Sequence, residues 1–154
     1  MKNNEQLTLK GHAKFTVRDA ETGEIKRVQE YDNIICTVGK TMIANNLTDA
    51  SPDNAMRVNY SALGTNVAVP DASDTQLGTE TYRNAIASET SSGAVAYLTA
   101  FYSAAECNGT YKEFGLFSNG TASANSGILL SHIAINVTKS VLETLTIDYT
   151  ITVS

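Results

Sequence analysis

Two histidines, His12 and His132, are the only imidazoles that this 154-residue chain could use as a general base. Catalysis by a serine, threonine or cysteine nucleophile needs such a ring within hydrogen-bonding reach. Neither histidine stands in a catalytic motif. His12 falls on the polar positions of an alternating segment, and His132 lies inside an apolar one. We therefore expect both rings to be structural.

The acidic residues closest to a ligand-binding pattern are Asp71, Asp74 and Glu80. Carboxylate oxygens suit calcium, but this segment lacks the dense Asp, Asn and Gly spacing of a calcium-binding loop. For Asp74, an Asx turn or a helix cap is the favoured role. The acidic residues also cluster on turns, whereas a glycosidase needs two carboxylates that face each other. We expect no metal, no cofactor and no catalytic residue, and hence no enzymatic activity.

Two cysteines, Cys36 and Cys107, lack the Cys/His or CxxC spacing of zinc and redox sites. We expect two buried thiols. A disulfide between them stays an alternative, because the sequence does not set the distance between their Cα atoms. Gly39-Lys40-Thr41 matches the end of a phosphate-binding loop, but no glycine stands five positions before Gly39.

Composition argues against two classes of partner. The formal net charge is -5, so no summed positive field attracts nucleic acid or anionic lipid. No stretch approaches the ~20 apolar residues that span a bilayer, and the first residues contain no apolar signal segment. The charged fraction is 18%, below the roughly 25% of an ordinary soluble domain. A surface poor in charge suits packing against neighbouring proteins.

The first third of the chain reads as a β-hairpin. Apolar or small residues occupy the odd positions from Leu7 to Val17, residues 18–24 supply a turn, and residues 25–36 read as the returning strand. This hairpin (residues 1–36) can project from a core formed by residues 37–154. Its solvent face is expected to carry the following basic residues: Lys10, Lys14, Arg18, Lys26 and Arg27.

One short helix is predicted at residues 38–47, with Thr37 as its N-cap. It ends before Pro52 and is short enough to plug one end of a sheet. Alternation at residues 56–62 predicts a strand, and a long surface loop follows at residues 65–74.

The remaining pattern is a series of strands and turns. Residues 82–89 and 94–102 flank a turn at residues 90–93, and Asn108-Gly109 marks a turn between residues 104–107 and 110–117, as a plain or a bulged hairpin. A loop rich in glycine, serine and asparagine at residues 118–127 is expected to be flexible or ordered by a partner. Residues 128–137 suit a strand buried on both faces, and residues 145–153 alternate strictly between apolar residues and threonine or aspartate.

Many short strands, one helix and no βαβ alternation predict a mainly β fold. We expect a single domain spanning residues 1–154, an antiparallel β-sandwich or a jelly-roll-like fold with one short helix.

Several motifs follow one another in an informative order. YDNIICTVGK at residues 31–40 precedes YSALGTN at 60–66 and a proline-containing acidic segment at 70–83; NGTYKEFGLF follows at 108–117, and a threonine-alternating strand at 139–151. This order resembles a recurrent class of bacteriophage tail-associated or virion structural proteins whose functions are poorly characterised. The resemblance covers residues 31–154. It implies a non-enzymatic virion component, made in the host cytoplasm, and leaves open tail fibre, baseplate, tail tip and capsid decoration.

Such a component is expected to form homo-oligomers and to dock on other virion proteins through exposed loops and strand faces. The predicted contact residues are Val67, Asp71, Asp74, Ser118, Asn119, Asn125, Lys10, Lys14 and Lys26. The alternative is a carbohydrate- or receptor-binding module at the particle tip that recognises a host-surface glycan. Its stacking platforms would come from Tyr60, Tyr82, Tyr97, Tyr102 and Tyr111, which otherwise belong to the core or to interfaces.

Overall fold

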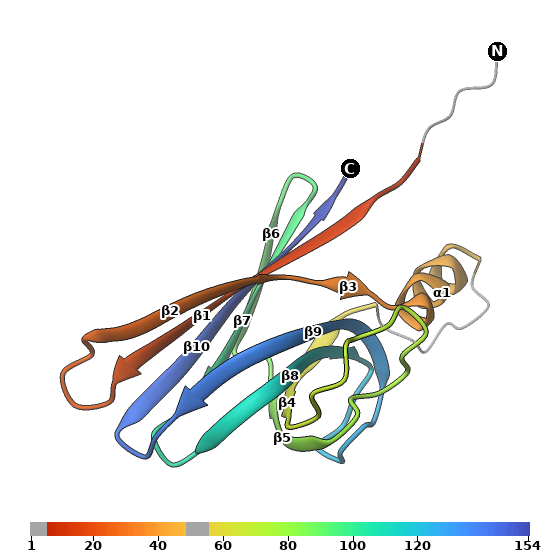
Figure 1. The fold of residues 1–154 in the computed structure, drawn as a ribbon. Coiled ribbons are helices and arrows are strands. Elements are labelled where there is room, and N and C mark those ends of the chain that lie inside the picture. Colours follow the sequence, from red (N-terminus) through yellow and green to blue (C-terminus); the bar gives the residue numbers. More distant parts are fainter. Residues whose placement is uncertain (1–5, 49–55) are drawn as a thin grey trace.

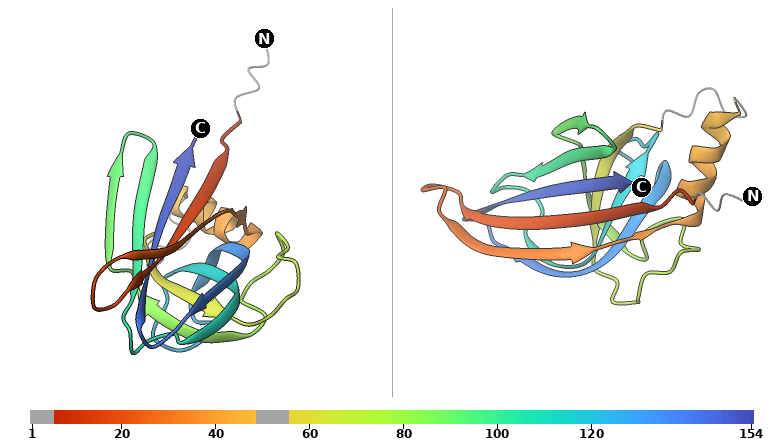
Figure 2. Two further views of the ribbon diagram at one scale, coloured as in Figure 1. Left: turned by 60° about the vertical axis from the view of Figure 1, so that its left-hand side comes forward. Right: turned by 90° about the horizontal axis from the view of Figure 1, so that it is seen from above.

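Two antiparallel five-stranded sheets pack face to face in the computed structural model, which describes residues 6–48 and 56–154 (Figures 1 and 2). Sheet A has the order β2-β1-β10-β7-β6, and sheet B the order β3-β9-β8-β4-β5. The predicted mainly β sandwich with one short helix is thus confirmed. The elements are β1 (Leu9–Asp19), β2 (Ile25–Asp32), β3 (Ile34–Ile35), α1 (Thr37–Leu47), β4 (Val58–Gly64), β5 (Glu80–Ala85), β6 (Ser88–Ser92), β7 (Val95–Tyr102), β8 (Gly109–Ser118), β9 (Ile128–Lys139) and β10 (Glu143–Val153).

The first hairpin is part of sheet A. β1 pairs with β10 over its whole length, so that Phe15 lies opposite Ile147 and Val17 opposite Leu145. All four side chains are buried. The period-two pattern of both segments therefore places one apolar face of each strand against sheet B.

The returning strand is shorter than the sequence predicted. It ends at Asp32, and Asn33 breaks the ladder because its side chain takes over hydrogen bonds of the backbone. Asn33 Oδ1 accepts from the N–H of Gly11 at 2.8 Å, and Asn33 Nδ2 donates to Ser131 Oγ of β9 at 3.0 Å. The next two residues, β3, then pair with β9 in sheet B. The expectation of one strand across residues 25–36 is corrected to two strands in different sheets.

The helix lies where it was predicted, but its cap differs. Thr37 is the first helical residue and Cys36 is the N-cap, without a side-chain hydrogen bond. Backbone groups replace the predicted threonine cap, since the Thr37 N–H donates to the Ala72 carbonyl at 2.7 Å. A Cβ on Gly39 would stand 2.9 Å from the Cα of Leu130. Glycine therefore lets α1 lie directly on β9 and cover one end of sheet B.

The middle of the chain crosses between the sheets twice. Residues 82–89 were predicted as one strand, but β5 belongs to sheet B and β6 to sheet A. Residues 90–92 belong to β6, so that the hairpin with β7 turns at Gly93, which has a positive φ of 56°. Residues 104–107 form a turn between the sheets, with Cys107 at φ 42°, and the predicted hairpin at Asn108-Gly109 is corrected to a crossover.

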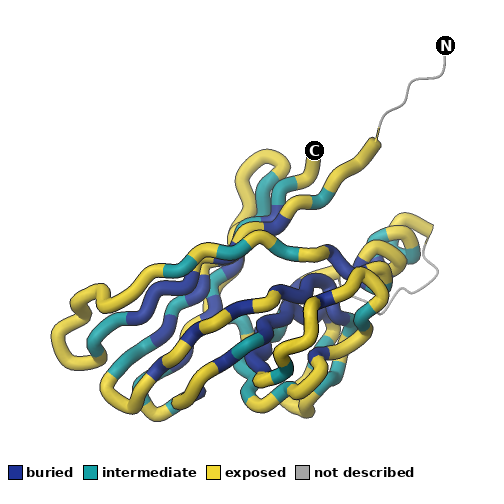
Figure 3. Tube along the Cα trace, viewed as in Figure 1, coloured by how far each residue is buried: buried dark blue, intermediate teal, exposed yellow. Residues whose placement is uncertain are grey.

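Two buried hydroxyl pairs join the sheets across the core. Tyr102 of β7 lies 2.7 Å from Ser61 of β4, and Tyr149 of β10 lies 2.7 Å from Ser131 of β9 (O–O distances). Burial raises the pKa of both phenols above the ordinary value. Because each hydroxyl has a partner in the opposite sheet, the polar atoms fix how the two apolar faces stack. Figure 3 shows the buried residues concentrated between the sheets.

The predicted two-sided burial of residues 128–137 holds only for part of β9. Its residues from Leu129 to Ile133 are buried consecutively, whereas Ala134, Asn136 and Thr138 are exposed. This consecutively buried part of β9 lies between sheet A and the segment formed by α1 and the loop at residues 65–79. Within the described residues, no helix has the length and apolar character needed to cross a membrane.

Candidate interaction surface at the open end

Sheet A extends beyond sheet B at one end of the sandwich. There the start of β1, the end of β10 and the β6–β7 hairpin stand clear of sheet B (Figure 1). A groove of about 550 Å³ lies between this extension and the elements that face it, β3, α1, β4 and β9. We call it the open-end groove. Sheet A contributes Leu9, Ala96, Leu98, Ile151 and Val153 to its lining, and the opposite wall consists of Ile35, Met42, Ile43, Met56, Val58 and Leu130.

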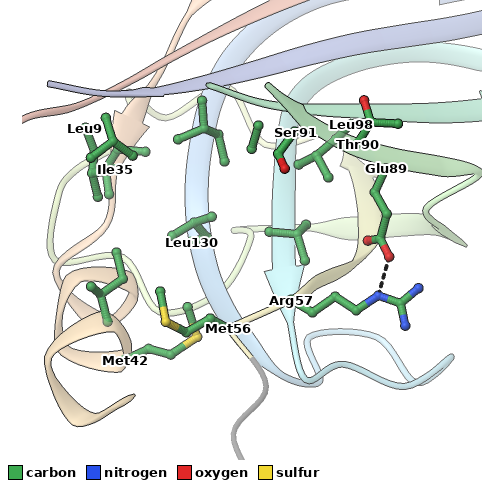
Figure 4. A pocket seen from close by; sticks show the side chains of 15 residues that line it. Leu9, Ile35, Met42, Met56, Arg57, Glu89, Thr90, Ser91, Leu98 and Leu130 are labelled. Atoms are coloured by element: carbon green, nitrogen blue, oxygen red, sulfur yellow. Dashed lines mark ion pairs between the residues drawn. The ribbon is translucent and has the colours of Figure 1, made fainter. Parts of the chain in front are cut away.

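The open-end groove is apolar except along one side. There Arg57 Nε lies 2.5 Å from Glu89 Oε1, and the pair links the start of β4 to β6 (Figure 4). Thr90 and Ser91 of β6 complete this side. The Arg57 side chain is 69% exposed, so the ion pair is screened by solvent and adds little stability. An apolar concavity of this size with a polar rim is typical of a binding site for apolar side chains of another molecule.

A second feature of this end is the strand edge of β6. All five residues of β6 are exposed, and its recorded strand pairing is with β7. Its other edge therefore presents backbone N–H and C=O groups to solvent within the described structure. Such an edge can accept another strand.

The most elaborate buried polar cluster involves His132. Its Nδ1 lies 2.8 Å from Asp74 Oδ2, and its Nε2 lies 3.0 Å from Glu113 Oε2. The Glu113 carboxylate also accepts the backbone N–H groups of Thr79 at 2.7 Å and Gly78 at 2.9 Å. Glu113 thus fastens the loop at residues 65–79 to sheet B, and a polar cavity of about 290 Å³ lies between this loop and the imidazole.

This cluster lacks the geometry of a catalytic base. Both ring nitrogens of His132 are occupied by carboxylates, and the side chain is only 5% exposed. A base needs a nitrogen that can reach the substrate proton. The predicted structural role of His132 therefore agrees with its position. His12 lies on the solvent face of β1, with Nδ1 2.9 Å from Asp32 Oδ1.

The thiols also have environments that suppress nucleophilicity. Both cysteines are free and buried. Burial, assisted by the nearby charge of Asp74, raises the pKa of Cys36 to about 11, and burial raises the pKa of Cys107 to about 12. Because the thiolate is the reactive form, these raised pKa values keep both groups as protonated, weakly nucleophilic thiols near neutral pH.

A second buried ion pair orders the loop at residues 118–127, which we call the small-residue loop. Arg83 donates to Glu80 through Nε at 2.7 Å and through Nη2 at 3.0 Å, and both side chains are at most 3% exposed. Arg83 Nη1 also donates to the Ser126 carbonyl at 2.9 Å, and the guanidinium carbon lies 4.2 Å from the Phe117 ring centroid. The expectation of a flexible or partner-ordered loop is corrected, because the chain itself supplies the contacts.

The predicted contact residues in the loop at residues 65–79 differ in solvent exposure. Val67 is 79% exposed and Asp71 is exposed, where it accepts the Ser73 N–H in an Asx turn. Asp74 is half-buried and faces His132. These residues share one loop, which Glu113 of β8 fastens to sheet B.

The predicted residues of the small-residue loop are not equally accessible. Ser118 is buried as the last residue of β8, whereas Asn119 is exposed. Asn125 is half-buried, and its N–H donates to Glu80 Oε2 at 2.8 Å. Both asparagines have a positive φ, which asparagine tolerates better than most residues.

The predicted lysines divide between two places. Lys10 and Lys14 lie on the outer face of β1, where Lys14 stands opposite Asp148. Lys26 lies at the hairpin tip, 3.6 Å from an Asp19 oxygen. Arg27 is exposed, and it also donates to the Thr138 carbonyl of β9 at 2.9 Å.

Tyrosine side chains are also unequally available for stacking. Tyr102 and Tyr111 are buried, and burial raises the pKa of Tyr111 to about 12. The ring centroid of Tyr60 lies 5.5 Å from the guanidinium carbon of Arg83, and Tyr82 packs edge-on against Tyr102. Tyr97 is 44% exposed on the outer face of sheet A.

Sequence reasoning missed the open-end groove, the buried ion pair of Glu80 and Arg83, and the strand β6. The groove residues come from eight separate elements and the segments beside them, so no local motif could predict them. One signal was available for the buried ion pair: a glutamate and an arginine three positions apart at residues 80 and 83. For β6, the run Ser88-Glu89-Thr90-Ser91-Ser92 has β-compatible residues but was divided between a strand and a turn.

Residues 6–48 and 56–154 contain no group of three or more His, Cys, Asp or Glu side chains arranged to hold a metal ion. Comparison of the chain with protein-family models, with curated proteins and with solved structures finds no match.

Proposed function

We propose that this chain is a non-enzymatic structural or adaptor component of a bacteriophage virion, which self-associates and docks on other virion proteins. The open-end groove is the observation that carries this proposal. Its lining is apolar, and it is open to solvent, whereas most of the apolar side chains between the two sheets are buried. Each large apolar side chain that a partner buries there gains roughly 1.5–3 kcal/mol.

The surroundings of the open-end groove support an assembly role. Met56 is 43% exposed and Val153 is 38% exposed, so the apolar surface continues from the groove onto its rim. The free edge of β6 borders the same groove. Apolar burial and main-chain hydrogen bonds would then be available to a partner at one place, as in strand addition.

Particle composition tests the proposal. Virions released from cells that carry the gene are purified on a density gradient, and their proteins are counted by quantitative mass spectrometry. We expect this chain to be present in a fixed number of copies per particle. Particles that lack the chain altogether would refute the proposed function.

A matched pair of variants tests the groove. Met56→Glu places a charge in the open-end groove, whereas Leu142→Glu makes the same kind of change at the opposite end, at a side chain that is 72% exposed. Both positions are on the surface, so the free energy of unfolding should change little. We expect particles from the Met56→Glu gene to contain less of the chain than particles from the Leu142→Glu gene. Equal incorporation of both variants would exclude the groove as the docking site.

One observation favours a second candidate function, a carbohydrate- or receptor-binding module. Tyr97 is exposed on the outer face of sheet A, between Thr90 of β6 and Thr150 of β10. An aromatic ring flanked by hydroxyl groups can stack on a sugar. Glycan-array binding by the purified protein that disappears in Tyr97→Ala would support this candidate, and an array without signal would remove it.

A further inference from the structure

We propose that two copies of this chain pair β6 with β6 in antiparallel orientation about a two-fold axis at Thr90. The two A sheets then form one continuous sheet. This inference rests on the proposed function, because it specifies how an assembly protein of this kind associates with itself.

The direction of the backbone groups in β7 follows from two hydrogen bonds. The Val153 N–H of β10 donates to the Ala94 carbonyl at 2.9 Å, so alternate residues from Ala94 onward face β10. The Thr99 carbonyl accepts the Ala87 N–H at 2.8 Å, so the other set faces β6. In an antiparallel ladder, successive residues direct their backbone groups to opposite sides.

The free edge of β6 can be assigned from this alternation. Ser88, Thr90 and Ser92 stand opposite the β7 residues whose backbone faces β6. Their N–H and C=O groups therefore point to β7, and the backbone groups of Glu89 and Ser91 point to the free edge. Two donors and two acceptors are thus available on an exposed strand.

β6 lacks the features that usually protect an edge. The other edge of sheet A, β2, carries Lys26, Arg27, Glu30 and Asp32 within eight residues. β6 contains no lysine and no proline, and Glu89 is its only charged residue. Natural sheet edges without lysine, proline or other protection are prone to pair with another strand. The contrast between the two edges of one sheet indicates that β6 is an interface.

The sequence of β6 is complementary to itself in one register. Centred at Thr90, the antiparallel pairing places Thr90 opposite Thr90, Ser88 opposite Ser92, and Glu89 opposite Ser91. Glu89 and Ser91 then exchange backbone hydrogen bonds twice, which gives four bonds in the dimer. A register centred at Glu89 would instead set two carboxylates opposite each other, which destabilises a sheet. Charge therefore disfavours the register at Glu89. The register at Thr90 is also the one that pairs all five residues of β6 with each other.

A two-fold contact of this kind is closed. The same strand is used by both partners, so the pairing ends with two copies and does not propagate into a fibre. Because β6 borders the open-end groove, the two grooves come to lie on the same face of the joined sheet. The dimer would offer a partner two apolar sites related by symmetry.

Disulfide trapping tests the register directly. In the proposed dimer, residue 90 faces its own copy as a pair without backbone hydrogen bonds, with Cβ atoms about 4.5–5.5 Å apart. This geometry is close to that of a disulfide. The native thiols are buried and do not compete. Under mild oxidation we expect Thr90→Cys to form a covalent dimer on non-reducing gels.

The controls use the same edge. Ser92→Cys alone should give no covalent dimer, because residue 92 faces residue 88 of the other copy. An equimolar mixture of Ser88→Cys and Ser92→Cys should give the mixed dimer. Equal cross-linking of Thr90→Cys and Ser92→Cys, or none for Thr90→Cys at concentrations where the protein is dimeric, would overturn the inference.

A backbone variant supplies the second readout. Ser91→Pro removes an N–H that faces the free edge, and proline at such a position leaves the ladder with β7 intact. Ser91→Ala keeps the N–H. We expect at least a tenfold higher dimer dissociation constant for Ser91→Pro than for Ser91→Ala in sedimentation, with similar melting temperatures.

The two proposals fail in different ways. A chain that is absent from particles removes the proposed function. A chain that is present in particles and self-associates in light scattering, but whose Ser91→Pro variant dimerises as well as Ser91→Ala, refutes the β6 dimer and leaves the proposed function standing.

Discussion

Glu113 offers a sharp test of how the loop at residues 65–79 is held. Its two carboxylate oxygens accept four hydrogen bonds. Oε1 accepts from the N–H groups of Thr79 at 2.7 Å and Asn66 at 3.3 Å, and Oε2 accepts from the N–H of Gly78 at 2.9 Å and lies 3.0 Å from His132 Nε2. The side chain is 2% exposed, so water does not replace a lost partner.

Glu113→Gln keeps the shape and removes the charge. The NH2 group of the glutamine must occupy one of the two former oxygen positions, and at either position it faces at least one backbone N–H. If the NH2 group takes the Oε2 position, the N–H of Gly78 loses its acceptor, which costs about 1–3 kcal/mol. The bonds of the remaining oxygen also change from charge-assisted to neutral, at about 1 kcal/mol or more in total. We expect Glu113→Gln to lower the free energy of unfolding by about 3 kcal/mol.

Urea unfolding at pH 7 measures this difference, and Glu30→Gln is the matched control. The Glu30 side chain is 56% exposed, so its substitution should change stability by about 0.5 kcal/mol or less. Hydrogen exchange supplies a local readout, since the amides of Gly78 and Thr79 should lose protection in Glu113→Gln. A loss of stability below 1 kcal/mol with unchanged protection of both amides would refute the reasoning.

Three further predictions follow from buried contacts. Arg83→Lys should cost about 3 kcal/mol in chemical unfolding, because lysine cannot make the bidentate ion pair and the contacts to the small-residue loop together; unchanged stability would contradict this. The free energy of unfolding should fall from about pH 9 upward. Burial raises the pKa of Cys36 to about 11 and that of Cys107 to about 12, whereas both thiols have a pKa of 9.0 in the unfolded chain. The stability that the protonated thiols contribute is therefore complete below about pH 9 and is lost as the pH rises through the folded values. A Cys36→Ala/Cys107→Ala variant should show a shallower decline in that range, and an equal decline would remove the thiols as its cause. Gly11→Ala should cost about 1–3 kcal/mol in thermal unfolding, because its Cβ would overlap the Tyr149 hydroxyl, whereas a tolerated alanine would show that the strand shifts freely.

Regular alternation made parts of the fold predictable. The last strand is the clearest example, since Leu145, Ile147, Tyr149 and Ile151 are all buried as the pattern required. The helix and the first hairpin were also located within a few residues. In these segments one face meets the core and the other meets solvent, so that local sequence records burial directly.

The errors lie where the chain changes sheets. Asn33, Ile86 and the turn at residues 104–107 separate strands that pair with different partners. At Asn33, side-chain hydrogen bonds to Gly11 and Ser131 end the ladder, and both partners are distant in sequence. A local pattern contains no record of which distant strand supplies the next hydrogen bonds.

The candidate sites show the same division between features that the local sequence determines and features that depend on contacts between distant segments. Sequence alone determined a mainly β chain with few charges, an alternating apolar face on most strands, and histidines without a catalytic motif. Only the tertiary structure decided that Asp74 and Glu113 meet His132, that Arg83 orders the small-residue loop, and that sheet A outruns sheet B to leave an apolar groove. The physical reason is that side-chain periodicity is a property of one strand, whereas a buried ion pair, a groove or a free edge depends on distances between strands that folding alone brings together.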